Sequence, residues 1–215
     1  MNVRHALLFA ALWCIVSSEV MSRPVSYAGG WTLIGESDRQ SSSALLHYTP
    51  TYQWSLGPRV EVNRDDHFSL TMLHATRLAK RWFGSDHQGN FYFFGGAGMA
   101  SGVEGNVLED RFAAYGGVMA DWETRSLFIS YRARYLDASH FRTQFMHAAR
   151  VGFAPYEGDT GALHTWLMLE IDHRPSHPDS FTATPLLRLF KGPFLVEAGY
   201  NITGNQPLLN FTYRF

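Results

Sequence analysis

Arginine is the commonest charged residue of the 215-residue sequence, and many arginines and carboxylates alternate with apolar side chains. Arginine binds a carboxylate through two parallel hydrogen bonds, whereas a ring of one charge inside a water-filled channel selects ions of the opposite sign. Ion pairing or ion selection is therefore the chemistry that these residues could perform. The residues concerned are Arg59, Glu61, Arg77, Asp121, Arg132, Arg134, Arg150, Glu170, Asp172, Arg188, Glu197 and Arg214.

A second group of polar residues has the composition of a metal site. Asp172, His173, His177 and Asp179 lie in one short segment that also contains two prolines. Zinc and copper sites use histidines at such short spacing, but they need three or four ligands that converge on one point. A polar loop without packing constraints has the same composition. We therefore predict no metal site, and we assign no cofactor to the chain.

The elements that must position the charged residues are strands. From Tyr52 to Asn63 the even positions are apolar, and the odd positions are polar, charged or glycine. The same period of two recurs from Leu127, from Leu163 and along the last residues of the chain. Successive side chains of a strand point to opposite faces, so each strand has one apolar face and one face that carries the charges.

Twelve strands fit into the chain, and an even number is typical of bacterial barrels with both termini in the periplasm. The weakest is 67–82, whose leucines would also suit an amphipathic helix, and ten strands is the alternative. The turns are short on both sides. The expected strands span 27–37, 43–49, 51–64, 67–82, 88–100, 110–122, 126–138, 144–156, 161–174, 180–191, 193–202 and 206–215.

Composition and charge exclude several classes of protein. A hydrophobic content of 46% with 15% aromatic residues excludes a disordered chain. The net charge of -1, without any block of basic residues, argues against a nucleic-acid partner. Mean hydropathy is only -0.16, and no segment after residue 22 is long and apolar enough for a membrane-spanning helix. If the chain enters a membrane, it must do so as a closed β-barrel.

The composition of the two faces favours a membrane barrel over a soluble sandwich. The polar face of a soluble sandwich is dense in lysine and glutamate, whereas the polar face here consists of arginine, glycine, serine and threonine. Aromatic residues near the expected strand ends are typical of the girdles at the two membrane interfaces. They are Trp54, Trp82, Trp122, Tyr135, Tyr156 and Phe215. We therefore predict an all-β fold, an antiparallel up-and-down transmembrane barrel.

The first residues are typical of a secretory signal peptide. A short basic start is followed by the apolar run 6–16 and by small polar residues, with cleavage expected after Ser18 or Ser22. Residues 1–22 thus form the signal peptide, and 23–215 form a single barrel domain. Cys14 is the only cysteine, so the mature chain would have no disulfide.

The last strand ends in alternating apolar residues, Leu209, Phe211, Tyr213 and Phe215. This pattern resembles the terminal signature of Gram-negative outer-membrane β-barrel proteins. The resemblance implies a location in the cell outer membrane, contact with its lipid, and recognition of Phe211, Tyr213 and Phe215 by the barrel-assembly machinery. In size and loop length the chain is also similar to the small twelve-stranded oligosaccharide-specific porins, whose pores are lined by basic residues.

These features predict a small porin-like channel or a structural surface barrel with an arginine-rich, salt-bridged lumen. Arginines outnumber acids in the predicted lumen set, which favours small solutes or anions if the lumen is open. Mixed signs at similar depth would instead pair and close it. Both alternatives remain open at this point.

The alternative from another class is an enzyme that acts on acyl chains of lipid A or phospholipid. His67 and Ser69 are similar to the His-x-Ser pair of the lipid A deacylase barrels, because a base beside a hydroxyl can activate it as a nucleophile. Leu70 follows where that family has asparagine, and no glutamate lies about a dozen residues further on. We therefore assign no catalytic residues and predict that the chain is not an enzyme.

Overall fold

A computed structural model describes residues 25–103, 110–159, 161–175 and 180–215. The predicted signal peptide with Cys14 lies outside the described residues, as do His177 and Asp179 of the polar segment. Among the described residues, no helix is long and apolar enough to cross a membrane.

The described residues form one closed barrel of twelve antiparallel strands, in which each strand pairs with its sequence neighbours and β1 pairs with β12. The predicted fold class and strand number are confirmed, and the segment expected at 67–82 forms a strand, Phe68–Phe83, rather than a helix. The strands are β1 (Trp31–Ser37), β2 (Ser41–Thr51), β3 (Trp54–Asn63), β4 (Phe68–Phe83), β5 (Gln88–Gly102), β6 (Arg111–Glu123), β7 (Leu127–Asp137), β8 (Thr143–Phe153), β9 (His164–His173), β10 (Phe181–Lys191), β11 (Phe194–Asn201) and β12 (Gln206–Arg214).

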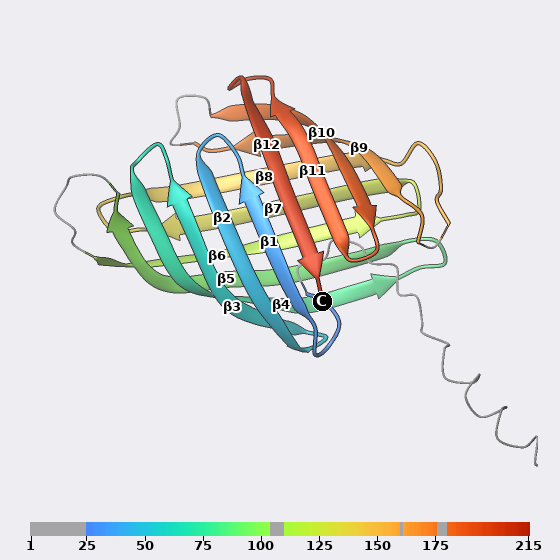
Figure 1. The fold of residues 1–215 in the computed structure, drawn as a ribbon, viewed down its shortest axis with the longest axis horizontal. Coiled ribbons are helices and arrows are strands. Elements are labelled where there is room, and N and C mark those ends of the chain that lie inside the picture. Colours follow the sequence, from blue (N-terminus) through green and yellow to red (C-terminus); the bar gives the residue numbers. More distant parts are fainter. Residues whose placement is uncertain (1–24, 104–109, 160, 176–179) are drawn as a thin grey trace, which may run out of the picture.

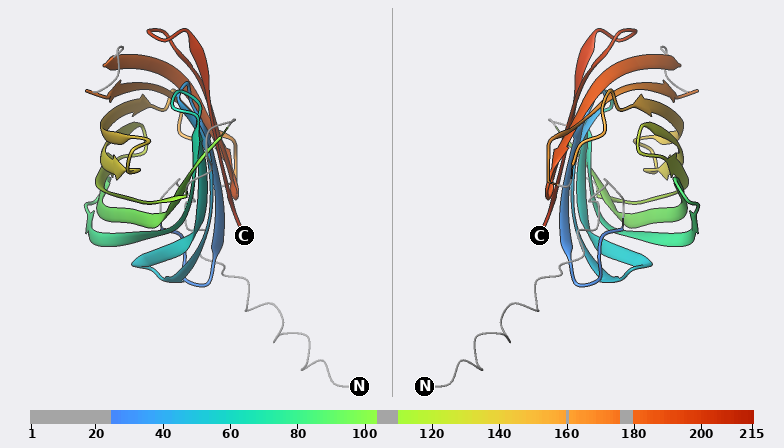
Figure 2. Two further views of the ribbon diagram at one scale, coloured as in Figure 1. Left: turned by 90° about the vertical axis from the view of Figure 1, so that its left-hand side faces the viewer. Right: turned by 90° about the vertical axis from the view of Figure 1, so that its right-hand side faces the viewer.

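The barrel has two walls that face each other. Figure 1 shows β1, β2, β11 and β12 running steeply across the front, while β6, β7 and β8 cross behind them at a large angle. The side views in Figure 2 show the two walls curving toward each other. We call the end where β1 begins and β12 ends the terminal rim, and the opposite end the far rim. At the terminal rim, main-chain hydrogen bonds between Trp31 and Phe215 complete the closure.

Alternating side chains give this barrel an apolar outside. In β4 the even positions from Phe68 to Leu78 are buried or nearly so, while Thr71 and Leu73 between them are exposed. A closed barrel pairs its own backbone groups, and an apolar outer surface of this extent belongs in lipid. The barrel is therefore a transmembrane one. The exposed aliphatic residues include Leu56, Val60, Val62, Leu73, Ile129, Val151, Leu167, Leu169 and Ile171.

Tryptophan side chains gather on the outside of the terminal rim. Trp31 and Trp54 begin their strands, whereas Trp82 and Trp122 lie one residue before the ends of theirs, and all four are exposed. The predicted aromatic belt is thus present at this rim. Trp166 differs, because its even position in β9 places it inside the barrel.

Glycine permits a close contact between the main chains of two neighbouring strands. A Cβ atom on Gly57 of β3 would lie 1.9 Å from the carbonyl oxygen of Leu46 and 2.7 Å from Cα of His47, both in β2. No side chain fits at such distances from main-chain atoms. Glycine therefore lets the main chains of β2 and β3 come close together near the terminal rim.

Candidate functional site: the charged lumen

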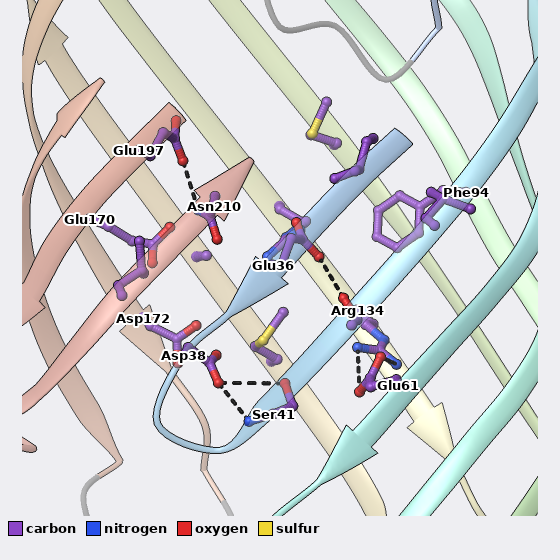
Figure 3. Close-up of a pocket in the computed structure, with 18 of the residues that line it drawn as sticks. Glu36, Asp38, Ser41, Glu61, Phe94, Arg134, Glu170, Asp172, Glu197 and Asn210 are labelled. Atoms are coloured by element: carbon purple, nitrogen blue, oxygen red, sulfur yellow. Dashed lines mark hydrogen bonds and ion pairs between the residues drawn. The ribbon is translucent and has the colours of Figure 1, made fainter. Parts of the chain in front are cut away.

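The lumen contains a cavity of about 240 Å³ whose lining is rich in charged side chains. Charged residues line the cavity because they occupy the inward-facing positions of strands whose outward-facing positions are apolar. In Figure 3, acidic side chains from both walls lie around one space. Ten of the twelve predicted lumen residues line this cavity: Arg59, Glu61, Asp121, Arg132, Arg134, Arg150, Glu170, Asp172, Arg188 and Glu197.

The first group of charges ties β1 and β3 to β7. Arg59 lies 3.2 Å from both Glu36 and Glu61, measured from Nη2 to a carboxylate oxygen. From the opposite wall, Arg134 approaches Glu61 at 3.1 Å and Arg132 approaches Glu36 at 3.4 Å. Each carboxylate is thus shared by two guanidinium groups, one from its own wall and one from across the lumen. Figure 3 shows the contact between Arg134 and Glu61.

A second group ties β8 to β9, β10, β11 and β12. Arg150 forms an ion pair with Glu170 of the neighbouring strand and reaches Glu197 of β11 at 3.0 Å. Arg188 donates to the other oxygen of Glu197, Oε1, at 2.7 Å, and Asn210 donates to Oε2, the oxygen that Arg150 approaches, also at 2.7 Å. Glu197 is only 3% exposed, so these donors replace the water that a carboxylate otherwise needs.

A third group lies at the far rim. Arg174, just beyond β9, lies 2.7 Å from Asp172 and 2.8 Å from Asp38 in the β1–β2 turn. Burial alone would raise the pKa of Asp38, but Arg174 and the backbone N–H groups of Ser41 and Gln40 outweigh it and hold the pKa below its ordinary value. This contact joins the two walls at the mouth of the lumen.

Apolar groups narrow the lumen beside the charges. Inward residues of β4 to β7 form one cluster, which includes Phe68, Met72 and Tyr115. A second cluster, centred on Phe128 and Trp166, also includes Leu186 of β10 and Leu208 of β12. These side chains fill space that a wide pore would leave to water. Packed apolar side chains and paired charges therefore share the lumen.

The charges that line the cavity nearly balance, which corrects the expected excess of arginine. Arg77 and Arg214 lie outside the cavity, whereas Arg174, Glu36 and Asp38 join its lining, so it faces six arginines and seven carboxylates. The predicted preference for anions therefore has no basis in the net lining charge. The cavity-lining ions are Arg59, Arg132, Arg134, Arg150, Arg174, Arg188, Glu36, Asp38, Glu61, Asp121, Glu170, Asp172 and Glu197.

Two predicted lumen residues lie elsewhere. Arg214 points inward but does not line the cavity; it is buried at the terminal rim, opposite Thr32 in the strand register. Arg77 was wrongly placed in the lumen. It occupies an odd position of β4, whose inward positions are even up to Leu78, and its guanidinium lies 5.4 Å from the ring centroid of Trp54 on the outer surface.

Sequence reasoning missed Glu36, Asp38 and Arg174. In β1 both Ile34 and Glu36 point inward, so the inward face is not uniformly polar and the period of two is weak there. Asp38 and Arg174 lie in turns, where no periodicity applies. Glu36 could have been predicted, because an acidic residue inside an expected strand of an arginine-rich barrel is a candidate partner for an inward arginine.

Neither the metal nor the enzyme alternative gains support from the described geometry. Among the described residues, no group of three histidine, cysteine or acidic side chains could hold a metal ion. The hydroxyl of Ser69 donates to the carbonyl oxygen of Ser101 at 3.4 Å. His67 lies in the β3–β4 turn with a φ of 52°, a left-handed conformation suited to a tight turn.

No protein-family model and no curated protein matches the sequence. Among solved structures, one described as "KdgM porin in complex with disordered oligogalacturonate" is 13% identical with a TM-score of 0.50, and the match covers 86% of this chain and 98% of that one. Another, "KdgM porin", is 14% identical with a TM-score of 0.49 over the same shares. Identities this low show the fold alone. The fold is that of outer-membrane porin-like barrels.

Proposed function

We propose that this protein is a narrow outer-membrane channel, in which water and small ions pass through a lumen restricted by arginine–carboxylate pairs. The observation that carries the proposal is the cavity of about 240 Å³, lined by charged side chains inside a closed transmembrane barrel. Side chains just fill the interior of an eight-stranded barrel, whereas twelve strands enclose more space, and charged groups from both walls line it here.

Water access differs among the ion pairs, and this difference supports a path along one side of the lumen. Arg132 and Glu36 have side chains that are 36% and 32% exposed, whereas Glu61 and Glu197 are nearly buried. Water therefore reaches the Arg132–Glu36 pair while the deeper pairs hold the walls together. Exposed ion pairs contribute little to stability, so this pair can open at small cost.

The balanced lining supports weak ion selectivity. A ring of one sign selects the opposite ion, but the charges of six arginines and seven carboxylates largely cancel. The similar porin structure was solved with oligogalacturonate, a polyanion. The lining of the present barrel offers no excess of positive charge that would favour such a solute, so small ions of either sign are the proposed cargo.

Planar-bilayer recording tests the proposal directly. The purified full-length mature protein should give discrete small conductance steps, with a reversal potential near zero in a salt gradient. Arg132→Gln should increase the step size, because it releases the most exposed pair across the lumen. Arg125→Gln, which removes a solvent-exposed arginine paired with Glu157 outside the barrel wall, should leave it unchanged. Silence at all voltages would leave only a structural or surface role.

Export and assembly complete the proposal. The signal peptide at 1–22 would direct the chain to the periplasm, and the last strand with Phe211, Tyr213 and Phe215 would be recognised by the barrel-assembly machinery. The mass of the protein recovered from outer membranes tests the first point, since cleavage after Ser18 or Ser22 gives two distinct masses. Recovery of the uncleaved chain would contradict it. We further propose that the protein has no enzymatic activity.

A further inference from the structure

Two cations face lipid on the outer surface of β4 at the terminal rim. Arg77 lies 5.4 Å from the ring centroid of Trp54, and Lys80 lies 5.2 Å from that of Trp82. Phe93 and Phe91 are their register partners in β5. We call this surface the basic-aromatic patch, defined as Trp54, Arg77, Lys80, Trp82, Phe91 and Phe93.

A β-bulge places both cations on the same face. Three positions separate Arg77 from Lys80, so a regular strand would point them to opposite faces. The register with β5 shifts between Leu78 and Lys80, which leaves Ala79 as the extra residue. Bulges commonly redirect a side chain in this way. After the bulge Lys80 points outward, and Arg81 turns to donate to Asn90 at 2.6 Å.

Both cations retain hydrogen-bonding capacity. Within the described part of the chain, each cation contacts an aromatic ring, and no carboxylate pairs with either. A ring contacts the face of a guanidinium and leaves the N–H groups at its edge free. Acidic strand residues at this rim, such as Asp121 and Glu123, occupy inward positions. The patch is therefore a site of positive charge without a protein counter-ion.

We propose that the basic-aromatic patch binds the phosphate of an anionic phospholipid in the periplasmic leaflet. The tryptophans hold the two cations at the depth of the membrane interface, where long basic side chains reach the head groups. The bidentate edge of Arg77 suits a phosphate, and the Lys80 ammonium adds a second donor. The choice of leaflet rests on the proposed porin-like topology, in which both chain termini and hence the terminal rim lie on the periplasmic side.

Native mass spectrometry of the full-length mature protein in detergent tests this site with three added lipids: phosphatidylglycerol, phosphatidylcholine and lipid A. The wild-type protein should retain phosphatidylglycerol in preference to the other two. The Arg77→Gln/Lys80→Gln variant should lose that preference, by about fivefold for each cation. The charge-conserving Arg77→Lys/Lys80→Arg variant should keep most of it.

Lys191→Gln is the matched control. Lys191 and Lys80 are the only lysines of the chain, and Lys191 also lies exposed at the terminal rim, at the end of β10 and away from the patch. This variant should bind phosphatidylglycerol like the wild type. Equal losses in the control and in the double variant, unchanged binding in the double variant, or a preference for lipid A would each overturn the proposal. Heat-modifiable migration in gels verifies that each variant is folded.

Discussion

Arg134 on β7 and Glu61 on β3 form an ion pair across the lumen, with 3.1 Å between Nη2 and Oε2. The two residues are 73 positions apart in the sequence and belong to opposite walls of the barrel. The guanidinium also lies 4.4 Å from the ring centroid of Tyr115, and the side chains of Arg134 and Glu61 are 15% and 5% exposed. The pair thus links the two walls at a depth that water scarcely reaches.

Glu61→Gln should destabilise the barrel strongly. It leaves Arg134 without its carboxylate and removes one of the two acids beside Arg59, and breaking one side of a buried pair costs about 3–5 kcal/mol. The Glu61→Gln/Arg134→Gln variant should lose less, because no guanidinium then stays unpaired at that position. Urea midpoints, followed by heat-modifiable migration in gels, measure both. Equal losses for the two variants would show that the residues are not coupled.

Acid should loosen the far rim through Asp38. Its pKa is held below the ordinary value of 3.8, so the carboxylate is favoured in the folded state. A lowered pKa stabilises the fold above the unfolded pKa, and this stabilisation is lost as the pH falls below about 4 through the folded value. The thermal unfolding midpoint, measured from about pH 6 to about pH 2, should decrease in that acid range. The decrease should be smaller in the Asp38→Asn variant.

Asp86→Asn is the comparison for this acid effect. Asp86 lies in the exposed β4–β5 turn beside His87. Water screens an exposed pair, so the variant should keep the wild-type dependence on pH. If Asp38→Asn and Asp86→Asn behave alike, the contact between Asp38 and Arg174 does not hold the rim.

Gly57→Ala should impair folding far more than Gly35→Ala. The added methyl group at position 57 would collide with the main chain of Leu46 and His47, whereas at Gly35 nothing lies within 4 Å of the new Cβ. Overpacking of this kind costs about 1–3 kcal/mol or more when backbone atoms must move. The yield of refolded barrel in detergent and the urea midpoint report the difference. Matching yields would mean that the main chains of β2 and β3 can move apart to accept the methyl group.

Phe215→Ala should reduce assembly in cells without weakening the finished barrel. The main chain of Phe215 both donates to and accepts from Trp31, at 3.0 and 2.8 Å, so closure of the barrel does not require the aromatic ring. The amount of protein in outer membranes should fall, while the urea midpoint after refolding in detergent stays at the wild-type value. An equal loss in both measurements would assign the ring a structural role instead.

Much of the architecture could be predicted because alternation is a local property. Val60 and Val62 face lipid while Arg59 and Glu61 face the lumen, and the parity of these neighbours is visible in the sequence itself. The same reasoning places Arg132, Arg134 and Arg150 inside. It fails at Arg77, because the alternation of β4 is weak: apolar Leu70 and Met72 occupy inward positions.

The sequence by itself determined the alternation that forms the strands and the parity of most charged residues, since both depend on neighbours along the chain, but it left ten strands open beside twelve. Only the tertiary structure decided which charges meet. Arg134 pairs with Glu61, and Arg150 pairs with Glu197, because closure of the barrel brings opposite walls within reach of a side chain. The bulge at Ala79 also appears only in the pairing of β4 with β5. Contacts across a lumen depend on curvature and strand register, which are properties of the whole sheet.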